Sequence, residues 1–310
     1  MMEKLKPLLP GEDLMGLIGR SHVLGIGETV RHTSSLLGVR AAKIEPGLFK
    51  SMDFLVLAKR LNISISELRQ RHTCQEMMGY CLDLNTRNKL FNEQVSETID
   101  RNCDVHSHPW RWCKKCVYQD LADYGVSYYH RDHQVPGIFQ CVKHGENIIH
   151  TCASCGFSAK NLNRQPIPPI DFNCPCCGDT YQTPSFELSG NMKLVQQYCL
   201  KMVYGDLDVN YEDIVKRAAR FMDNISCEHR ALTDETVIKE FYRGLNSYYS
   251  IEELNHYCRA HIRKSGNYCT LLRGAKLYNI DAKYLPKHPL SYALLMVFLE
   301  NHQPKAMNAA

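Results

Sequence analysis

The chain has 310 residues, enough for two or three domains, and a formal net charge of only +4. Its hydrophobic fraction of 44% and charged fraction of 23% are ordinary for a soluble globular protein, which excludes global disorder. The longest apolar run, residues 292–299, is far shorter than a membrane span, and the first 20 residues lack the apolar core of a signal peptide. With 15 cysteines, such a chain is expected in a reducing compartment, by default the cytoplasm.

Residues 52–72 predict a helix-turn-helix unit within a helical N-terminal region. Apolar residues at helical spacing indicate a first helix over 54–61, and Asn62 and Ile63 indicate a turn. Ser64 and Glu67 form a capping-box pattern that opens a second helix, which could enter a DNA groove. A helical hairpin packed in a bundle is the alternative. The outward polar groups of the second helix would be Ser66, Arg69, Gln70 and Arg71, with Arg69 and Arg71 as candidate nucleic-acid contacts.

Between residues 113 and 177, eight potential metal ligands occur in four closely spaced pairs, a spacing that allows both members of a pair to point at one tetrahedral centre. Pairing in chain order predicts a first site of Cys113, Cys116, Cys141 and His144 and a second site of Cys152, Cys155, Cys174 and Cys177. Alternatives are open: Cys176 could replace Cys174 or Cys177, and His130 or His133 could compete for the first site.

Each predicted site has four protein ligands, so both Zn²⁺ ions are expected to be structural. A catalytic zinc normally keeps one position open for water, which disfavours an enzyme such as a nuclease that uses His130 or His133. Disulfides are disfavoured by the reducing compartment. The zinc-binding region is expected to unfold without metal, because the binding free energy of a structural zinc is comparable to the whole stability of a typical domain. Tyr128, Tyr129 and Val135 are expected to form a small core over the metal.

Residues 186–310 predict a second helical region. Thr233 is placed to cap one helix, and Ser250 with Glu253 forms a capping box for the next, which makes a second candidate helix-turn-helix. Tyrosines and cations then interleave, a composition suited to phosphate binding and base stacking, although a solvated basic face is the alternative. The cations are Arg259, Arg263, Lys264, Arg273, Lys276, Lys283 and Lys287. The apolar helix over 288–300 is expected to pack in a core.

These patterns predict a mainly α fold with small zinc-stabilised β knuckles. We expect an N-terminal helical, helix-turn-helix domain over residues 1–104 and a double zinc-binding domain of knuckle or ribbon type over 105–185. A C-terminal helical domain with the basic aromatic segment would cover 186–310.

Several motifs resemble the TnsD/TniQ family of transposon target-site selectors. They are the Cys-x2-Cys pair at 113–116, the aromatic and histidine-rich stretch 124–137, and Cys-Val-Lys-His-Gly at 141–145. Residues 9–14 and 288–299 also look like that family, so the similarity spans nearly the whole chain. By this resemblance, Cys113, Cys116, Cys141 and His144 match the family's zinc ligands.

The resemblance implies a non-enzymatic protein of a bacterial mobile element, in the cytoplasm and at the nucleoid when it is bound to DNA. Such proteins engage double-stranded DNA by sequence, or ride on an RNA-guided CRISPR effector complex, and recruit the AAA+ regulator TnsC. Two departures are the end of the chain at Ala310, where TnsD-type members often continue into a DNA-binding region, and Tyr129, where the family usually has tryptophan. A zinc-ribbon transcription regulator is the alternative function, and the oligomeric state, including a homodimer, is left open.

Overall fold

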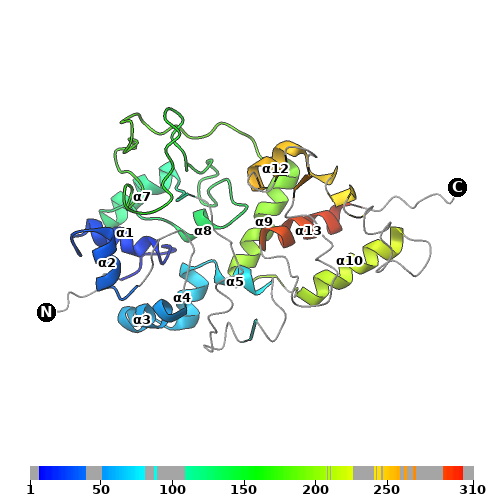
Figure 1. Cartoon of the computed structure of the whole chain (residues 1–310), viewed down its shortest axis with the longest axis horizontal. Helices are drawn as coiled ribbons and strands as arrows, with labels where there is room; N and C mark the ends of the chain where they lie inside the picture. Colours follow the sequence, from blue (N-terminus) through cyan, green and yellow to red (C-terminus); the bar gives the residue numbers. More distant parts are fainter. Residues whose placement is uncertain are drawn as a thin grey trace. The chain divides into compact units, whose positions relative to one another are not determined.

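The computed structural model describes residues 7–39, 51–80, 87–88, 109–207, 209, 211–225, 241, 243–245, 247–258, 262–263, 268–269 and 289–302. The Cα positions divide the chain into two compact units (Figure 1). Unit 1 comprises Met1–Glu76, Asp104–Glu187 and Val203–Gly205; unit 2 comprises Met77–Cys103, Leu188–Met202 and Asp206–Ala310. The predicted mainly α class is confirmed. In the described ranges, no helix has the length and apolar character needed to traverse a bilayer.

The helices of the N-terminal half are short, and two of them begin at side-chain caps. Thr29 accepts a hydrogen bond from the backbone N–H of His32 (3.0 Å), and Ser64 accepts one from that of Glu67 (3.1 Å). Each bond satisfies a backbone donor that a helix start would otherwise leave free. The helices are α1 (Gly16–Val23), α2 (Val30–Leu36), α3 (Ser51–Leu61), α4 (Ile65–His72) and α5 (Gln75–Gly79).

Helices α3 and α4 form the predicted pair, joined by a turn at 62–64 in which Asn62 adopts a left-handed φ of 53°. The capping role predicted for Ser64 is confirmed. One outward group was wrongly predicted: Arg69 is buried, because α5 follows directly and the Arg69 Nε donates to the Gln75 side chain (3.2 Å). Arg71 is exposed and forms an ion pair with Glu67 (3.1 Å).

One hydrophobic core spans the helices of unit 1 and its cysteine-rich region. Leu17 of α1 and Leu68 of α4 belong to the same buried cluster as Trp110, Trp112 and Tyr181. The ring centroids of Trp112 and Tyr181 lie 5.4 Å apart, edge to face, a favourable aromatic geometry. The first two predicted segments therefore share their core, while the boundaries predicted at 104 and 185 stay a prediction.

A buried ion pair anchors the start of unit 1. The Arg20 Nε lies 2.6 Å from Glu12 Oε1, and a second guanidinium nitrogen lies 2.8 Å from Oε2. Glu12 is 0% exposed and Arg20 3%. Arg20 also donates to the carbonyl of Pro7 (2.7 Å), and Glu12 accepts from the N–H of Leu9 (3.0 Å). Two charges thus tie residues 7–12 to α1.

The close approach of α1 to Pro166 requires glycine at position 19. A Cβ added to Gly19 would lie inside van der Waals contact with the Pro166 carbonyl, which is backbone and cannot rotate away. We therefore expect Gly19→Ala to lower the free energy of unfolding by about 1–3 kcal/mol, the usual cost of overpacking a core. Urea unfolding followed by tryptophan fluorescence measures it.

Gly190→Ala is the matched control for Gly19→Ala. Gly190 begins α9, and a Cβ there meets nothing within 4 Å. This change should leave stability unchanged or raise it by up to ~1 kcal/mol through helix propensity. Equal destabilisation by the two changes would contradict the close approach of α1 and Pro166.

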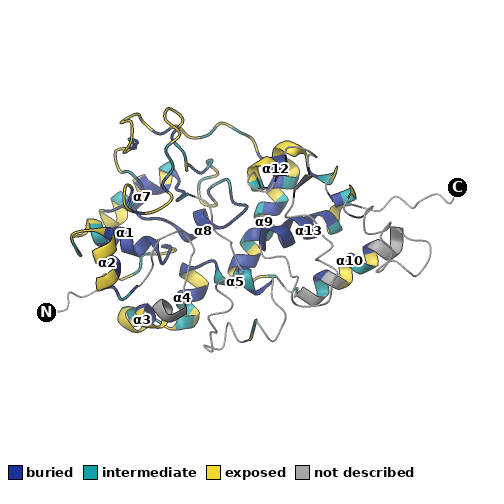
Figure 2. Ribbon diagram, in the orientation of Figure 1, coloured by how far each residue is buried: buried dark blue, intermediate teal, exposed yellow. Residues whose placement is uncertain are grey.

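Unit 2 contains α9 (Gly190–Tyr204, whose last two residues belong to unit 1), α10 (Tyr211–Ile225), α12 (Ile251–Cys258) and α13 (Pro289–Asn301). The predicted capping box is confirmed in both directions: the Glu253 N–H donates to Ser250 Oγ (3.1 Å), and the Ser250 N–H to Glu253 Oε2 (2.7 Å). Helix α13 is buried from Pro289 to Phe298, which confirms its predicted core role (Figure 2). The helix predicted after Thr233 lies outside the described residues. Two short antiparallel strands, β1 (Ile262–Arg263) and β2 (Tyr268–Cys269), are the only strands in the described ranges.

Candidate metal centres

The first cluster brings Cys113, Cys116, Cys141 and His144 together. The Nδ1 of His144 lies 3.6, 3.4 and 3.6 Å from the three sulfurs in that order, and the sulfurs of Cys116 and Cys141 are 3.6 Å apart. Tetrahedral geometry with the bond lengths of zinc would separate nitrogen from sulfur by about 3.5 Å and sulfur from sulfur by about 3.8 Å. The four donors therefore fit one tetrahedral ion.

Two different local structures present these donors. Cys113 is the N-cap of α7 (Lys114–Tyr124), and Cys116 follows on its first turn. Cys141 and His144 lie in a tight turn, where the N–H of Gly145 donates to the Cys141 carbonyl (2.8 Å) and the N–H of Cys141 to the Glu146 carbonyl (2.8 Å). This knuckle turns the two side chains toward the same point.

The second cluster contains Cys152, Cys155, Cys174 and Cys177, whose sulfurs lie within 4.8 Å of one another. Cys152 and Cys177 are 3.7 Å apart, as are Cys155 and Cys174. The turns from Cys152 and from Cys174 repeat the hydrogen bonds of the Cys141 turn, with distances of 2.8–2.9 Å. Four sulfurs at this separation fit a tetrahedral ion as well.

Each of the three knuckles has a glycine directly after its second donor. Gly145, Gly156 and Gly178 have φ values of 65°, 73° and 81°, a left-handed conformation that glycine adopts without the steric cost of a Cβ. The glycine that follows each of these pairs is visible in the sequence, but the prediction of the sites relied on donor spacing and did not use it. Cys116 is followed by Val117 instead, consistent with its place in a helix.

The alternative ligands left open by the sequence are also placed. Cys176 is exposed, and its thiol is not one of the four donors of the second cluster. Its backbone N–H donates a hydrogen bond to the Cys174 sulfur (3.4 Å). His130 Nε2 lies 2.9 Å from the Asp120 carboxylate. The Nε2 of His133 approaches two sulfurs of the first cluster, those of Cys141 (3.4 Å) and Cys116 (3.8 Å), whereas His144 approaches all three.

The thiols of the first cluster are crowded and buried. Hydrogen bonds with Cys113 and Cys116 lower the pKa of the Cys141 thiol. Hydrogen bonds with Cys113 and Cys141 raise the pKa of the Cys116 thiol. Cysteine binds a metal ion as the thiolate, so the protons on these thiols must leave when a metal binds. A divalent cation would take the place of those protons, so binding should release protons and weaken as pH falls. Each cluster could hold one metal ion.

Three of the nine predicted nucleic-acid contacts lie within the described residues, two of them on α4. Arg69 is buried in unit 1, and Arg71 is exposed on α4. Arg263 belongs to β1 in unit 2. The remaining predicted cations lie outside the described residues: Arg259, Lys264, Arg273, Lys276, Lys283 and Lys287.

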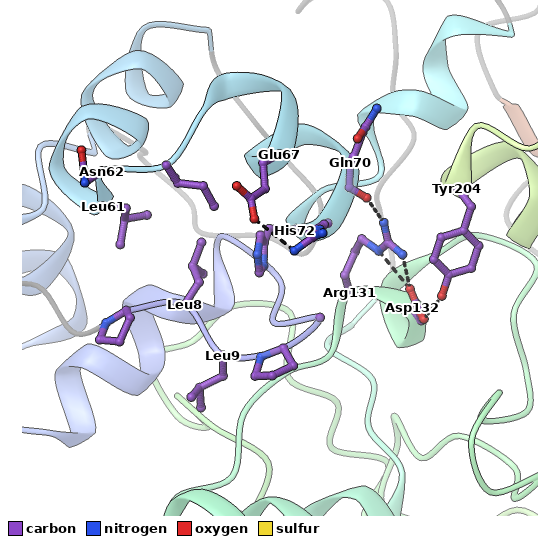
Figure 3. A pocket seen from close by; sticks show the side chains of 15 residues that line it. Leu8, Leu9, Leu61, Asn62, Glu67, Gln70, His72, Arg131, Asp132 and Tyr204 are labelled. Atoms are coloured by element: carbon purple, nitrogen blue, oxygen red, sulfur yellow. Dashed lines mark hydrogen bonds and ion pairs between the residues drawn. The ribbon is translucent and has the colours of Figure 1, made fainter.

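A groove of about 830 Å³ lies beside α4 in unit 1 (Figure 3). Arg131 and Asp132, an ion pair at 2.7 Å, line it on α8 (Arg131–Gln134). Arg131 also donates to the Gln70 carbonyl, and its guanidinium lies 4.7 Å from the ring centroid of Tyr204. Burial, together with the nearby carboxylate, raises the pKa of Tyr204 to about 12. The rest of the lining is mixed: Leu8, Leu9, Leu61 and Ile63 are apolar, whereas Glu67, Arg71 and His72 are polar or charged. Arg131 thereby fixes the end of α4 to α8, a contact that sequence patterns did not predict.

Unit 1 thus joins a pair of short helices to a cysteine-rich module with two possible metal centres. Residues 7–147 match the model of the TniQ family, a family associated with transposition. No curated protein matches the chain.

Proposed function

We propose that the protein is a transposon target-site selector, an adaptor without catalysis of its own that engages target DNA and recruits the AAA+ regulator TnsC. The observation that carries the proposal is the TniQ match over residues 7–147, which includes α3, α4 and the whole first cluster. Target DNA is engaged directly or through an RNA-guided CRISPR effector complex. The protein acts in the cytoplasm of a bacterium, at the nucleoid when bound.

In this proposal both clusters hold structural Zn²⁺. Three cysteines with one histidine and four cysteines are donor sets of structural zinc sites. The proposed ligands, Cys113, Cys116, Cys141, His144, Cys152, Cys155, Cys174 and Cys177, would fill all four positions of each ion, so the metal would supply folding energy and leave no site for an activated water.

The proposed DNA contacts lie on the α3–α4 pair and in the basic segment. Lys59 and Arg60 are exposed at the end of α3, and Ser66, Gln70 and Arg71 are exposed on α4. Exposed cations suit phosphates, which position a protein on DNA, and polar groups on a helix can read base edges. The cations between Arg259 and Lys287 would add phosphate contacts.

The test is binding of the zinc-loaded protein to duplex DNA of the host's attachment locus and to random DNA across a salt series. Preference for the locus supports direct reading, and weak, salt-sensitive, sequence-blind binding supports specificity borrowed from a guide-RNA complex. Association with an ATP-loaded AAA+ partner is measured in parallel. Action at a promoter without any such association would instead make the protein a transcription regulator.

Neutralising four cations of the basic segment should flatten the salt dependence of DNA binding. Each lost phosphate contact reduces the slope of log K against log salt by about 0.9, so Arg259, Arg263, Lys264 and Arg273 changed to glutamine should reduce it by up to ~3.6. The matched control changes to glutamine four exposed cations outside both proposed DNA surfaces: Lys160, Arg164, Lys193 and Lys216. An unchanged slope in the first variant would remove this segment from the DNA interface.

A further inference from the structure

The first cluster presents an electrostatic problem once it holds a metal. Three thiolates and a neutral imidazole around a divalent cation leave a net charge of −1, and Cys113, Cys116 and Cys141 are at most 2% exposed. Buried charge is costly unless hydrogen-bond donors surround it. Metal centres of this kind are held by polar groups just outside the ligands.

His133 lies where such a donor is needed. It stands on α8, is 2% exposed, and its Nε2 is 3.4 Å from the Cys141 sulfur and 3.8 Å from the Cys116 sulfur. Its ring centroid lies 5.1 Å from that of His130, which Asp120 holds through a 2.9 Å contact. The His133 ring therefore packs against a histidine that is itself held in place by a carboxylate.

The other nitrogen of His133 indicates which one carries the proton. Nδ1 is buried and has no hydrogen-bond partner among the described residues. A neutral imidazole has one N–H donor and one acceptor nitrogen. A proton on Nδ1 would leave a buried donor unpaired, whereas a proton on Nε2 points at two sulfurs and leaves only an acceptor unpaired. Unpaired buried donors are the rarer case in folded proteins, so the surroundings favour the Nε2–H form.

We propose that His133 is a positioning residue of the first metal centre, donating its Nε2–H to the thiolates of Cys141 and Cys116. The donated bonds offset the negative charge on sulfur and slow the loss of the metal. This inference rests on the metal-binding part of the proposed function and is independent of the DNA and TnsC roles. His144, which approaches all three sulfurs, remains the fourth ligand.

The experiment compares three substitutions in the full chain, loaded with Zn²⁺ or Co²⁺. The amide nitrogen of glutamine can occupy the position of His133 Nε2, whereas that of asparagine corresponds to Nδ1 and falls short of the sulfurs; phenylalanine has no donor. We expect His133→Phe and His133→Asn to release metal from the first centre to a chelator about 10–100 times faster than the native protein, with His133→Gln close to native.

The second cluster serves as an internal control. The rate of metal release from the second cluster and its four-sulfur Co²⁺ spectrum should be the same in all variants. The sulfur-to-cobalt charge-transfer bands of the first centre should shift only in the variants that lack a hydrogen-bond donor at the position of His133 Nε2. Native bands and release rates in His133→Phe would overturn the inference, as would equal acceleration by the glutamine and asparagine variants. A native protein that binds one Co²⁺ with four-sulfur character would overturn the metal role of the first cluster itself.

A measurement on the native protein avoids any effect of substitution on folding. Long-range ¹H–¹⁵N spectra of histidine-labelled, zinc-loaded protein distinguish the two neutral tautomers. An Nε2–H tautomer for His133 and a metal-bound Nδ1 for His144 support the inference. An Nδ1–H tautomer for His133, or metal bound to His133 instead of His144, would overturn it.

Discussion

Cys141→Ser should bind one metal equivalent in place of two and unfold at a lower temperature than the native protein. Cys141 contacts Cys116 and His144 in the first cluster, so its loss leaves an incomplete centre. Structural zinc contributes roughly 10–16 kcal/mol of apparent binding free energy in small peptides, and losing even a third of that would lower the melting temperature by about 10 °C or more. Zinc content by a colorimetric chelator and thermal unfolding by circular dichroism measure both effects.

Cys176→Ser is the control for Cys141→Ser. Cys176 is an exposed cysteine in a knuckle of the second cluster, but its thiol is not among the four donors. This variant should keep two metal equivalents and a native melting temperature. A loss of metal in Cys176→Ser, or two equivalents in Cys141→Ser, would contradict the donor sets.

Arg20→Ala should lower the free energy of unfolding by about 3–5 kcal/mol, because it leaves the buried carboxylate of Glu12 without its cation. Arg20 supplies two short contacts to Glu12 and a third to Pro7, and neither charged side chain is accessible to water. Urea unfolding at pH 7 measures the loss. The Arg71–Glu67 pair provides the contrast, since both side chains are exposed, and Arg71→Ala should cost less than ~1 kcal/mol.

The pH dependence of Arg20→Ala gives a second check. Burial raises the pKa of Glu12 above its ordinary value even beside Arg20, and removing the cation should raise it further. The native state then binds more protons than the unfolded state between pH ~4.3 and the raised pKa, so stability falls as pH rises through this window. The variant should therefore recover part of its lost stability between pH 7 and pH 5. A double change of Glu12→Leu with Arg20→Met should recover much of it at pH 7. Native stability of the Arg20→Ala variant at pH 7 would contradict the presence of a buried ion pair between Glu12 and Arg20.

The predictions made from sequence succeed where the physical cause is local. Two residues between donors fix how a knuckle turns, so the eight clustered donors could be grouped from spacing. Ser64 and Ser250 cap helices through bonds to residues three positions away, and both caps were predicted for that reason.

Contacts between segments that are distant in the sequence could not be predicted from local patterns. The burial of Arg69 depends on where α5 lies, and the approach of His133 to Cys116 depends on how α8 packs against α7. The Glu12–Arg20 pair joins α1 to the segment before it, and its burial comes from the fold of all of unit 1. An apolar stripe shows that a helix has a buried face without showing which segment covers it.

The shared core of unit 1 also bears on where the protein can be divided. The TniQ match ends at residue 147, yet Cys152, Leu162, Phe172, Cys174 and Tyr181 belong to the same buried cluster as Leu17 and Trp112. A protein shortened to residue 147 would keep every donor of the first cluster but expose the face of Trp112 that meets Phe172 and Tyr181. The stretch recognisable by sequence is thus smaller than the stretch that must fold together, and expression of this domain alone should extend at least to residue 187.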